Sequence, residues 1–258
     1  MSEVKVGAVL REGPLPATRL DADRVNSLVD ARGVRGESEV RLPQVTPISR
    51  QIGGSCVTNA FCDGLEILKG IEDPSSVEQL SRSALYYWSR CRHGAQDKDE
   101  GTYPSAAAAQ LLTIGVVPER FWEHTEEHLF KAPPVRLTMM AAANRVQGVH
   151  QITDKGVNLL DTVEWSVRAG LPVVCCLELT QGFRDPSWDA VLDAGGATWG
   201  SHAMLVVGFR HGSTGREYLL RNSWGTGWGN GGYVWITAKL LQEAFGLFML
   251  TLMKGLVY

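Results

Sequence analysis

Residues 222–229 read Asn222-Ser223-Trp224-Gly225-Thr226-Gly227-Trp228-Gly229, and this stretch decides the fold. Two residues far upstream give it meaning. His202 lies 20 residues before Asn222, and Cys56 lies 146 residues before His202. A cysteine attacks a carbonyl carbon as the thiolate, and a neighbouring imidazolium stabilises that form. A side-chain amide can hold the imidazole in one tautomer and one orientation. The chain therefore presents a candidate nucleophile, base and orienting group.

The sequence around these three residues resembles the papain-like cysteine peptidases, in the branch found in bacteria and phages, from about residue 40 to the C-terminus. The resembling stretches are Leu80-Ser81 with Tyr86-Tyr87-Trp88, residues 101–107, residues 202–209, and residues 222–229 with Gly231-Gly232-Tyr233. The resemblance implies an α+β fold with two lobes. The left lobe would be helical, the right lobe would be an antiparallel β-sheet or barrel, and the active-site cleft would lie between them.

The pattern of apolar residues predicts where the lobes lie. We expect an N-terminal arm over residues 1–40, either regulatory or partly disordered, and a peptidase domain over residues 41–258, with a helical lobe at about 50–150 and a β lobe at about 151–258. The predicted helices are a short one at 21–30, one that starts at Ser55, and others at 77–90, 105–113, 135–144 and 159–169. The predicted strands are 172–179, 203–209, 217–221, 233–237 and 247–253.

Cys56 is predicted to stand at a helix N-terminus, because Val57, Phe61 and Leu65 repeat at helical spacing after it. The helix dipole and the free backbone N–H groups favour negative charge there, so we expect them to lower the pKa of the Cys56 thiol. The same N–H groups could bind an oxyanion. Ser55 is predicted to cap this helix.

The resemblance also implies a glutamine six residues before the nucleophile as an oxyanion donor. This chain has Arg50 at that position and Gln51 one residue later, so Gln51 becomes the candidate donor beside the Cys56 backbone N–H. Two further positions depart from papain. Val57 stands where papain has Trp, and Gly53 stands where papain has a cysteine, so papain's disulfide bond at that position cannot form.

A second group of residues is predicted to contact substrate, again because of the resemblance. The segment 100–102 would pair with an extended peptide as an added strand, with an ordinary tight turn as the alternative. Trp224 would shield the hydrogen bond between His202 and Asn222 from water. The candidate substrate-binding residues are Ser55, Glu100, Gly101, Thr102, Ala203, Trp224 and Trp228.

Composition narrows the possible partners and location. The 258 residues carry a formal net charge of −3 and contain no apolar run of membrane-spanning length, so neither nucleic acid nor membrane is expected as a partner. The first residues lack the apolar core of a signal peptide, and five cysteines are an odd number. We expect a cytoplasmic protein, with non-classical secretion or association with a phage or virion left open.

No metal and no cofactor are expected. His124 and His128 have a spacing that could place both on one side of a helix, but no acidic metal-binding motif accompanies them. The cysteines other than Cys56 are expected to pack in the core; these are Cys62, Cys91, Cys175 and Cys176.

These observations predict a cysteine endopeptidase that hydrolyses peptide bonds through a thioester acyl-enzyme. Two alternatives stay open: an acyl transferase, deamidase or peptide ligase on the same scaffold, and a non-catalytic binding module with the same fold. The expected partner is a polypeptide substrate. Because no inhibitory propeptide of ordinary length precedes the domain, we expect residues 1–40 or an inhibitory or regulatory protein partner to restrict the cleft.

Overall fold

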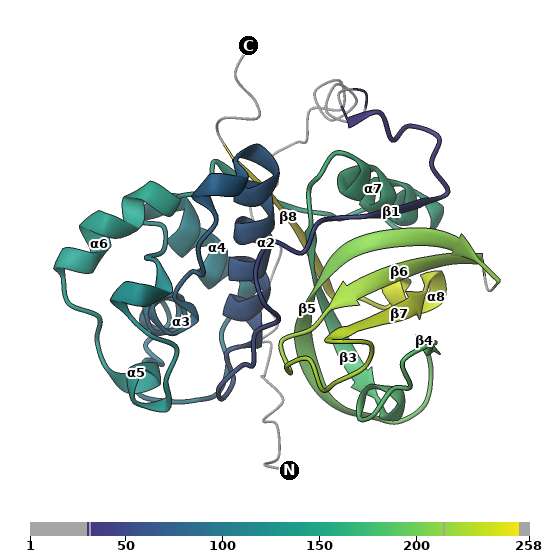
Figure 1. The fold of residues 1–258 in the computed structure, drawn as a ribbon. Helices are drawn as coiled ribbons and strands as arrows, with labels where there is room; N and C mark the ends of the chain where they lie inside the picture. The colour runs from purple at the N-terminus through teal and green to yellow at the C-terminus, as the bar shows by residue number, and fades with distance from the viewer. Residues whose placement is uncertain (1–29, 31, 214, 253–258) are drawn as a thin grey trace.

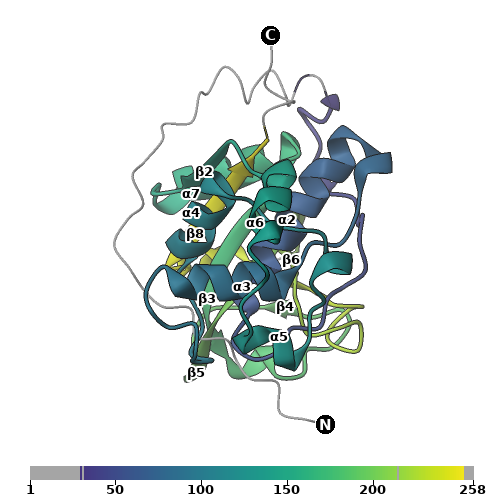
Figure 2. The same ribbon diagram turned by 90° about the vertical axis from the view of Figure 1, so that its left-hand side faces the viewer.

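A computed structural model of the chain describes residues 30, 32–213 and 215–252. Helices form one lobe, and a sheet with two further helices forms the other (Figure 1). Helix α2 (Cys56–Glu72) stands between them. Figure 2, turned so that the helical lobe faces the viewer, shows the helices as a layer in front of the sheet. The expected α+β fold with two lobes is confirmed.

The predicted helices from Ser55 onward are present. The helical lobe contains α2, α3 (Arg82–Cys91), α4 (Pro104–Thr113), α5 (Glu126–Phe130) and α6 (Arg136–Ala141). Short 3-10 turns occur at Pro74–Ser76, Glu119–Phe121, Ala142–Asn144 and Gln181–Phe183. The sheet lobe adds α7 (Gly156–Arg168) and α8 (Ala238–Gln242).

Helix α2 is buried on nearly all sides because it lies between the lobes. Its predicted apolar residues Val57, Phe61 and Leu65 are fully buried. Gly64 faces the sheet, where a Cβ would be in ordinary contact with the side chain of Leu205, 3.4 Å away. Burial of α2 from its first residue onward fixes the helix against the sheet lobe, and Cys56 with it.

The sheet has the strand order β2–β8–β3–β5–β6–β7–β4, and β1 pairs with β5. All pairs are antiparallel except β4 with β7. The strands are β1 (Glu39–Arg41), β2 (Gly148–Gln151), β3 (Val173–Thr180), β4 (Val191–Leu192), β5 (Thr198–Gly212), β6 (Gly215–Arg221), β7 (Tyr233–Thr237) and β8 (Gly246–Thr251). The five predicted strands are all present. Strand β5 is longer than predicted because β3 and β6 pair with it along most of its length.

Some predicted boundaries are wrong. The helix expected at 77–90 begins only at Arg82, because the Ser81 side chain accepts a hydrogen bond from the Ala84 N–H and caps it there. Just before this cap, Leu80 forms an isolated bridge with Pro118. The elements β1, β2, β4, α5 and α8 were not predicted, since segments of two to five residues are too short to show a period.

The predicted N-terminal arm falls largely outside the described residues, and so does the helix predicted at 21–30 apart from Asp30. The described end of the arm is attached to the sheet lobe. The Arg32 guanidinium donates to the carbonyl oxygens of Val167 at 2.8 Å and Arg168 at 2.6 Å, at the C-terminus of α7, where a cation is favoured. Strand β1 then pairs with β5, so residues 32–41 pack on the domain.

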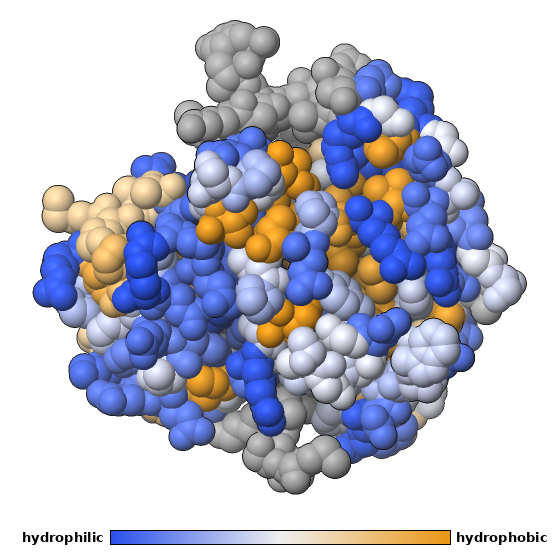
Figure 3. All heavy atoms as spheres, in the orientation of Figure 1, coloured by the Kyte–Doolittle hydropathy of each residue, from blue (hydrophilic) through white to orange (hydrophobic). Residues whose placement is uncertain are grey.

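Exposed apolar side chains gather on and beside α6, where Val135, Met139 and Met140 are exposed. In Figure 3 this end of the helical lobe is the tan surface at the left. Among the described residues, no helix is both long enough and apolar enough to cross a membrane.

Candidate active site

Cys56 is the first residue of α2 and is fully buried. Three backbone N–H groups act on its sulfur, those of Ala203, Val57 and Cys56 itself. Ala203 belongs to β5, so its N–H brings the strand that carries His202 onto the nucleophile. The structure therefore joins Cys56 to the residue next to His202, although His202 lies 146 residues after Cys56 in the sequence.

His202 and Asn222 form the second half of the site. The His202 Nε2 lies 2.8 Å from the Asn222 Oδ1, and the same oxygen accepts from the Ser223 N–H at 2.7 Å. Because Oδ1 can only accept, Nε2 carries the proton of the neutral ring and Nδ1 is left with a lone pair. Within the part of the chain that the structure describes, Nδ1 is buried and has no hydrogen-bond partner. This is the state in which Nδ1 can take a proton.

Trp224 contacts the His202 ring, and two further tryptophans lie against Trp224. The Trp224 ring lies over His202 with centroids 4.7 Å apart, and Trp228 meets Trp224 edge-on at 5.4 Å. Trp199, which the sequence did not single out, lies 6.2 Å from Trp224. Trp228 is held by its own Nε1–H, which donates to the Phe183 carbonyl at 2.8 Å. The hydrogen bond between His202 and Asn222 is thus buried beneath indole rings, where it is stronger than in water.

The predicted lowering of the thiol pKa is wrong for this structure. Burial raises the pKa of the Cys56 thiol to about 12, although the three backbone N–H groups act in the opposite direction. Burial likewise lowers the pKa of the His202 imidazole to about 4, against the effect of its hydrogen bond to Asn222. Loss of solvation outweighs the helix N-terminus, so the thiol and the imidazole are both neutral at pH 7 in this structure.

The Gln51 side chain lies beside the residue that follows Asn222. Its Oε1 accepts from the Ser223 hydroxyl at 2.8 Å, and its Nε2 donates to the Gly53 carbonyl at 3.1 Å. The backbone is also joined there, because the Gln51 N–H donates to the Ser223 carbonyl at 2.7 Å. Ser223 therefore fixes which end of the amide faces which way. Ser223 lies inside the motif at residues 222–229, but no pattern in the sequence predicts a role for its side chain.

The other predicted residues differ in their surroundings. Ser55 does not cap α2 with its side chain, which is a correction; its hydroxyl donates to the Ile52 carbonyl at 2.8 Å and accepts from Asn59. The side chain of Glu100 is 65% exposed. Gly101 and Thr102 are buried. The hydroxyl of Thr102 is 3.2 Å from a ring nitrogen of His93.

A buried ion cluster lies between the lobes behind these residues. Asp63 on α2 accepts from Arg82 at 2.6 Å and from Arg221 at 3.0 Å, and Glu66 accepts from Arg82 at 2.6 Å. All four side chains are almost fully buried. Charged side chains are tolerated in a protein interior when they are paired with opposite charges. The signal in the sequence is two acids three residues apart, Asp63 and Glu66, among the apolar residues of α2.

The prediction that the cysteines other than Cys56 pack in the core is only partly confirmed. Cys62, Cys175 and Cys176 are buried as expected, but Cys91 at the end of α3 is exposed.

The two histidines considered as metal ligands have separate partners: His124 Nδ1 lies 2.8 Å from the Ser83 hydroxyl, and His128 stacks on Trp122. Among the described residues, no three His, Cys, Asp or Glu side chains are grouped as a metal site.

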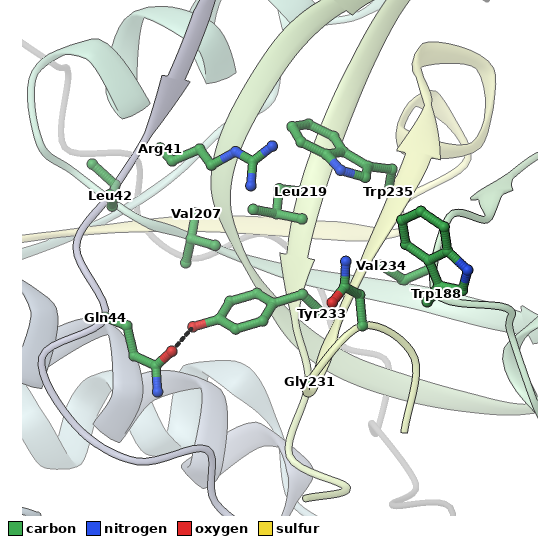
Figure 4. Close-up of a pocket in the computed structure, with 11 residues that line it drawn as sticks. Arg41, Leu42, Gln44, Trp188, Val207, Leu219, Gly231, Tyr233, Val234 and Trp235 are labelled. Atoms are coloured by element: carbon green, nitrogen blue, oxygen red, sulfur yellow. Dashed lines mark hydrogen bonds between the residues drawn. The ribbon is translucent and has the colours of Figure 1, made fainter. Parts of the chain in front are cut away.

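A hollow of about 350 Å³ lies apart from Cys56, on the outside of the sheet lobe. Figure 4 shows it between the segment after β1 and strands β6 and β7, with the Tyr233 hydroxyl bonded to Gln44. The guanidinium groups of Arg41 and Arg210 lie 5.1 and 4.1 Å from the Trp235 ring. The lining residues are Arg41, Leu42, Gln44, Trp188, Val207, Leu219, Asn230, Gly231, Tyr233, Val234 and Trp235. None of the predicted site residues lines it.

Comparisons with known proteins find relatives described as peptidases and cysteine proteases. A protein described as an uncharacterized peptidase C1-like protein of Acanthamoeba polyphaga mimivirus is 25% identical over 214 residues, which cover 79% of this chain and 68% of that protein. A cysteine protease of Blomia tropicalis is 26% identical over 188 residues, which cover 71% of this chain and 54% of that protein. The chain therefore spans about half the length of the second relative.

Solved structures share the fold. Xylellain, a cysteine protease from Xylella fastidiosa, superposes with a TM-score of 0.82 at 18% identity, covering 97% of both chains. The bromelain protease from Ananas comosus, solved in complex with the E64 inhibitor, superposes with a TM-score of 0.68 at 16% identity, covering 84% of this chain and 99% of that one.

The family itself is established by a match along most of the sequence. Residues 38–244 match the family described as "Papain family cysteine protease". This range includes Cys56, His202 and Asn222, and the fold agrees with it. The chain belongs to the papain family of cysteine proteases.

Proposed function

We propose that this protein is a cysteine endopeptidase that hydrolyses polypeptides through a Cys56–His202–Asn222 triad. One observation carries the proposal. Strand β5 places the Ala203 N–H on the Cys56 sulfur, while the preceding residue, His202, bonds to Asn222 through Nε2 and keeps Nδ1 unpartnered within the described residues. A nucleophile, a base with a lone pair and an orienting amide are the parts that acyl transfer requires.

The proposed reaction has two stages. The Cys56 sulfur, its proton taken by His202 Nδ1, attacks the scissile carbonyl carbon, and His202 returns the proton to the leaving amine as the C–N bond breaks and a thioester remains. His202 then takes a proton from water, which attacks the thioester, and the proton passes to the departing Cys56 sulfur. Asn222 holds the imidazole throughout.

The oxyanion of each tetrahedral intermediate would be bound by the Gln51 Nε2–H and the Cys56 backbone N–H. Ser223 supports this role, because its hydroxyl occupies Oε1 and leaves Nε2 as the outward donor. In this structure Nε2 is bonded to the Gly53 carbonyl at 3.1 Å, so a substrate carbonyl would have to replace that bond.

The neutral state of the site has a consequence for this mechanism. With the Cys56 pKa raised to about 12 and the His202 pKa lowered to about 4, proton transfer between them is uphill while both are buried. Water or the polar backbone of a substrate would restore solvation and move both values back toward their ordinary range. We infer that proton transfer between Cys56 and His202 requires this solvation.

Hydrolysis is favoured over the alternatives by the comparisons. The Blomia, Xylella and Ananas proteins named above are described as cysteine proteases or proteases, and none of these descriptions mentions a transferase or a module without activity. The polypeptide substrate of this chain and an inhibitory or regulatory protein partner stay predictions, as does a cytoplasmic location.

An epoxysuccinyl inhibitor tests the proposal. The protein would be incubated with the inhibitor, and its intact mass would be measured by mass spectrometry. Wild type would be compared with Cys56→Ala, His202→Ala and Cys91→Ala. Cys91 is the matched control because it is an exposed thiol outside the site. We expect a single adduct on wild type and on Cys91→Ala, and none on the other two variants. An adduct that survives in Cys56→Ala, or none on wild type, would contradict the assignment of the nucleophile.

A further inference from the structure

A chain of hydrogen bonds joins the loop in front of Cys56 to the segment 100–102. The Gly54 N–H donates to Asp99 Oδ1 at 2.7 Å, and the Tyr86 hydroxyl donates to the same oxygen at 2.9 Å. The Tyr86 oxygen in turn accepts from the Gly101 N–H at 3.0 Å. One carboxylate oxygen therefore connects both loops, directly on one side and through a phenol on the other.

The two loops approach each other too closely for side chains to separate them. A Cβ on Gly53 would lie 2.4 Å from an Asp99 carboxylate oxygen, and a Cβ on Gly54 would lie 2.8 Å from the Gly101 nitrogen. Gly53 and Gly101 also have left-handed backbones, with φ of 57° and 87°, which glycine adopts without strain. With no side chains on these glycines, Asp99 and Tyr86 set the distance between the loops.

Asp99 and Tyr86 are themselves held from behind by Arg90. The Arg90 guanidinium lies 3.9 Å from the Tyr86 ring centroid and donates to the Lys98 carbonyl, the residue before Asp99. Tyr86 and Arg90 are fully buried. The carboxylate is thus fixed by its neighbours rather than free to rotate.

We propose that Asp99, with Tyr86 as its partner, is a positioning residue that fixes the nucleophile loop relative to the segment that pairs with substrate. The inference rests on the proposed function, because the segment 100–102 matters only if a peptide pairs with it. Through Gly54, Asp99 orients the backbone that leads into Cys56 two residues later. Through Tyr86 and Gly101, the same oxygen sets where a bound peptide lies.

This double contact links the position of the sulfur to the position of the scissile carbonyl. Covalent catalysis depends on reacting atoms that meet at a near-attack distance, and small displacements are costly. Removing Asp99 would release both loops, whereas removing the Tyr86 hydroxyl would release only the substrate segment. The two changes should therefore affect different kinetic constants.

The test compares four variants in the full-length protein. Asp99→Ala removes the acceptor, Asp99→Asn keeps an oxygen for both donors, and Tyr86→Phe removes the link to Gly101 alone. Asp97→Ala is the control, because Asp97 is an exposed carboxylate in the same loop and its loss changes the net charge equally. The readouts are kcat and KM on a fluorogenic peptide amide, the rate of labelling by the epoxysuccinyl inhibitor, and the unfolding midpoint.

We expect Asp99→Ala to lower kcat/KM on the order of 10²-fold, the loss typical of a displaced catalytic geometry, and to slow labelling as well. Asp99→Asn should recover most of this loss, and Tyr86→Phe should act mainly through a higher KM. Asp97→Ala should match wild type in every readout.

Three results would overturn the inference. Asp99→Ala could be no more impaired than Asp97→Ala, Asp99→Asn could be as impaired as Asp99→Ala, or Tyr86→Phe could leave KM unchanged. The Tyr86→Phe result decides the matter even if Asp99→Ala does not fold. A wild-type protein that neither cleaves peptides nor takes the label would contradict the proposed function instead, so the two failures are distinguishable.

Discussion

Arg221 and Asp63 tie the two lobes together, with the Arg221 Nε–H donating to Asp63 Oδ2 at 3.0 Å and both side chains almost fully buried. Arg221 also donates to the carbonyl oxygens of Thr46 and Pro47. Asn222 follows directly in the sequence. Asp63 lies on the helix that begins at Cys56, so this ion pair connects the element that carries the nucleophile to the segment that orients the base.

Replacing Arg221 by Leu should destabilise the protein and also impair the site. Removing one partner of a buried ion pair costs about 3–5 kcal/mol when the other charge is left alone. Asp63 would lose one of its two buried cations and keep Arg82, so the cost should lie at or below the lower end of that range. We therefore expect a marked fall in the free energy of unfolding, measured by urea denaturation. Lys131→Ala, which breaks the exposed pair with Glu127, should change it by less than about 1 kcal/mol. If both variants lowered the free energy of unfolding equally, burial of the Arg221–Asp63 pair would not explain the loss.

Asn222→Ala should reduce turnover more than it reduces stability. The change removes the acceptor that holds His202 Nε2 at 2.8 Å, so the imidazole can rotate or adopt the other tautomer. We expect kcat to fall on the order of 10²-fold, as for the loss of a well-placed acid–base group, with KM little changed. Asn230→Ala, at an exposed asparagine in the same loop between β6 and β7, is the control. A variant of Asn222 with normal kcat would remove it from the mechanism.

Substitutions at Gln51 and Arg50 test which residue is the oxyanion donor. The family's glutamine position is occupied by Arg50 here, and Gln51 follows one residue later. The Gln51 side chain is buried beside Ser223, whereas Arg50 is exposed and pairs through its backbone with Trp224. Gln51→Ala should lower kcat by about 10²- to 10³-fold, the usual loss for one oxyanion donor. Arg50→Ala should retain activity within a few-fold. The reverse pattern in steady-state kinetics would show that the donor is misassigned.

Much of the fold could be predicted from the sequence, because its strands and long helices are local patterns. The run 172–179 is rich in β-branched residues, and β3 forms within one residue of it. The glycines and tryptophans around Asn222 form a local motif. This motif can be recognised in the sequence without knowledge of any distant contact. Cys56, His202 and Asn222 could be singled out for the same reason.

The remaining parts of the site depend on contacts that no local pattern reveals. Asp99 meets Gly54 across 45 residues, and Arg221 meets Asp63 across 158. The expected side-chain cap at Ser55 failed because its hydroxyl finds the Ile52 carbonyl instead. The thiol pKa was predicted in the wrong direction, because the sequence shows the helix N-terminus but not the burial that outweighs it.

Two histidines, the buried His202 and the half-buried His124, should make the protein less stable in mild acid. Burial lowers the pKa of both His202 and His124 from the ordinary 6.5 to about 4. In the unfolded chain both rings take up a proton near pH 6.5. The unfolded state therefore binds more protons between these values, so stability is full above pH 6.5, falls as the pH drops toward 4, and falls no further from this cause below it.

Each histidine contributes a slope of about 1.4 kcal/mol per pH unit to the free energy of unfolding within that window. His124→Gln should remove one of the two contributions while leaving His202 in place, so the slope between pH 6 and 4.5 should fall by that amount. Urea denaturation at intervals of half a pH unit measures it. An unchanged slope would mean that His124 titrates in the folded protein as it does in the unfolded chain, and that its burial against Ser83 does not keep it neutral.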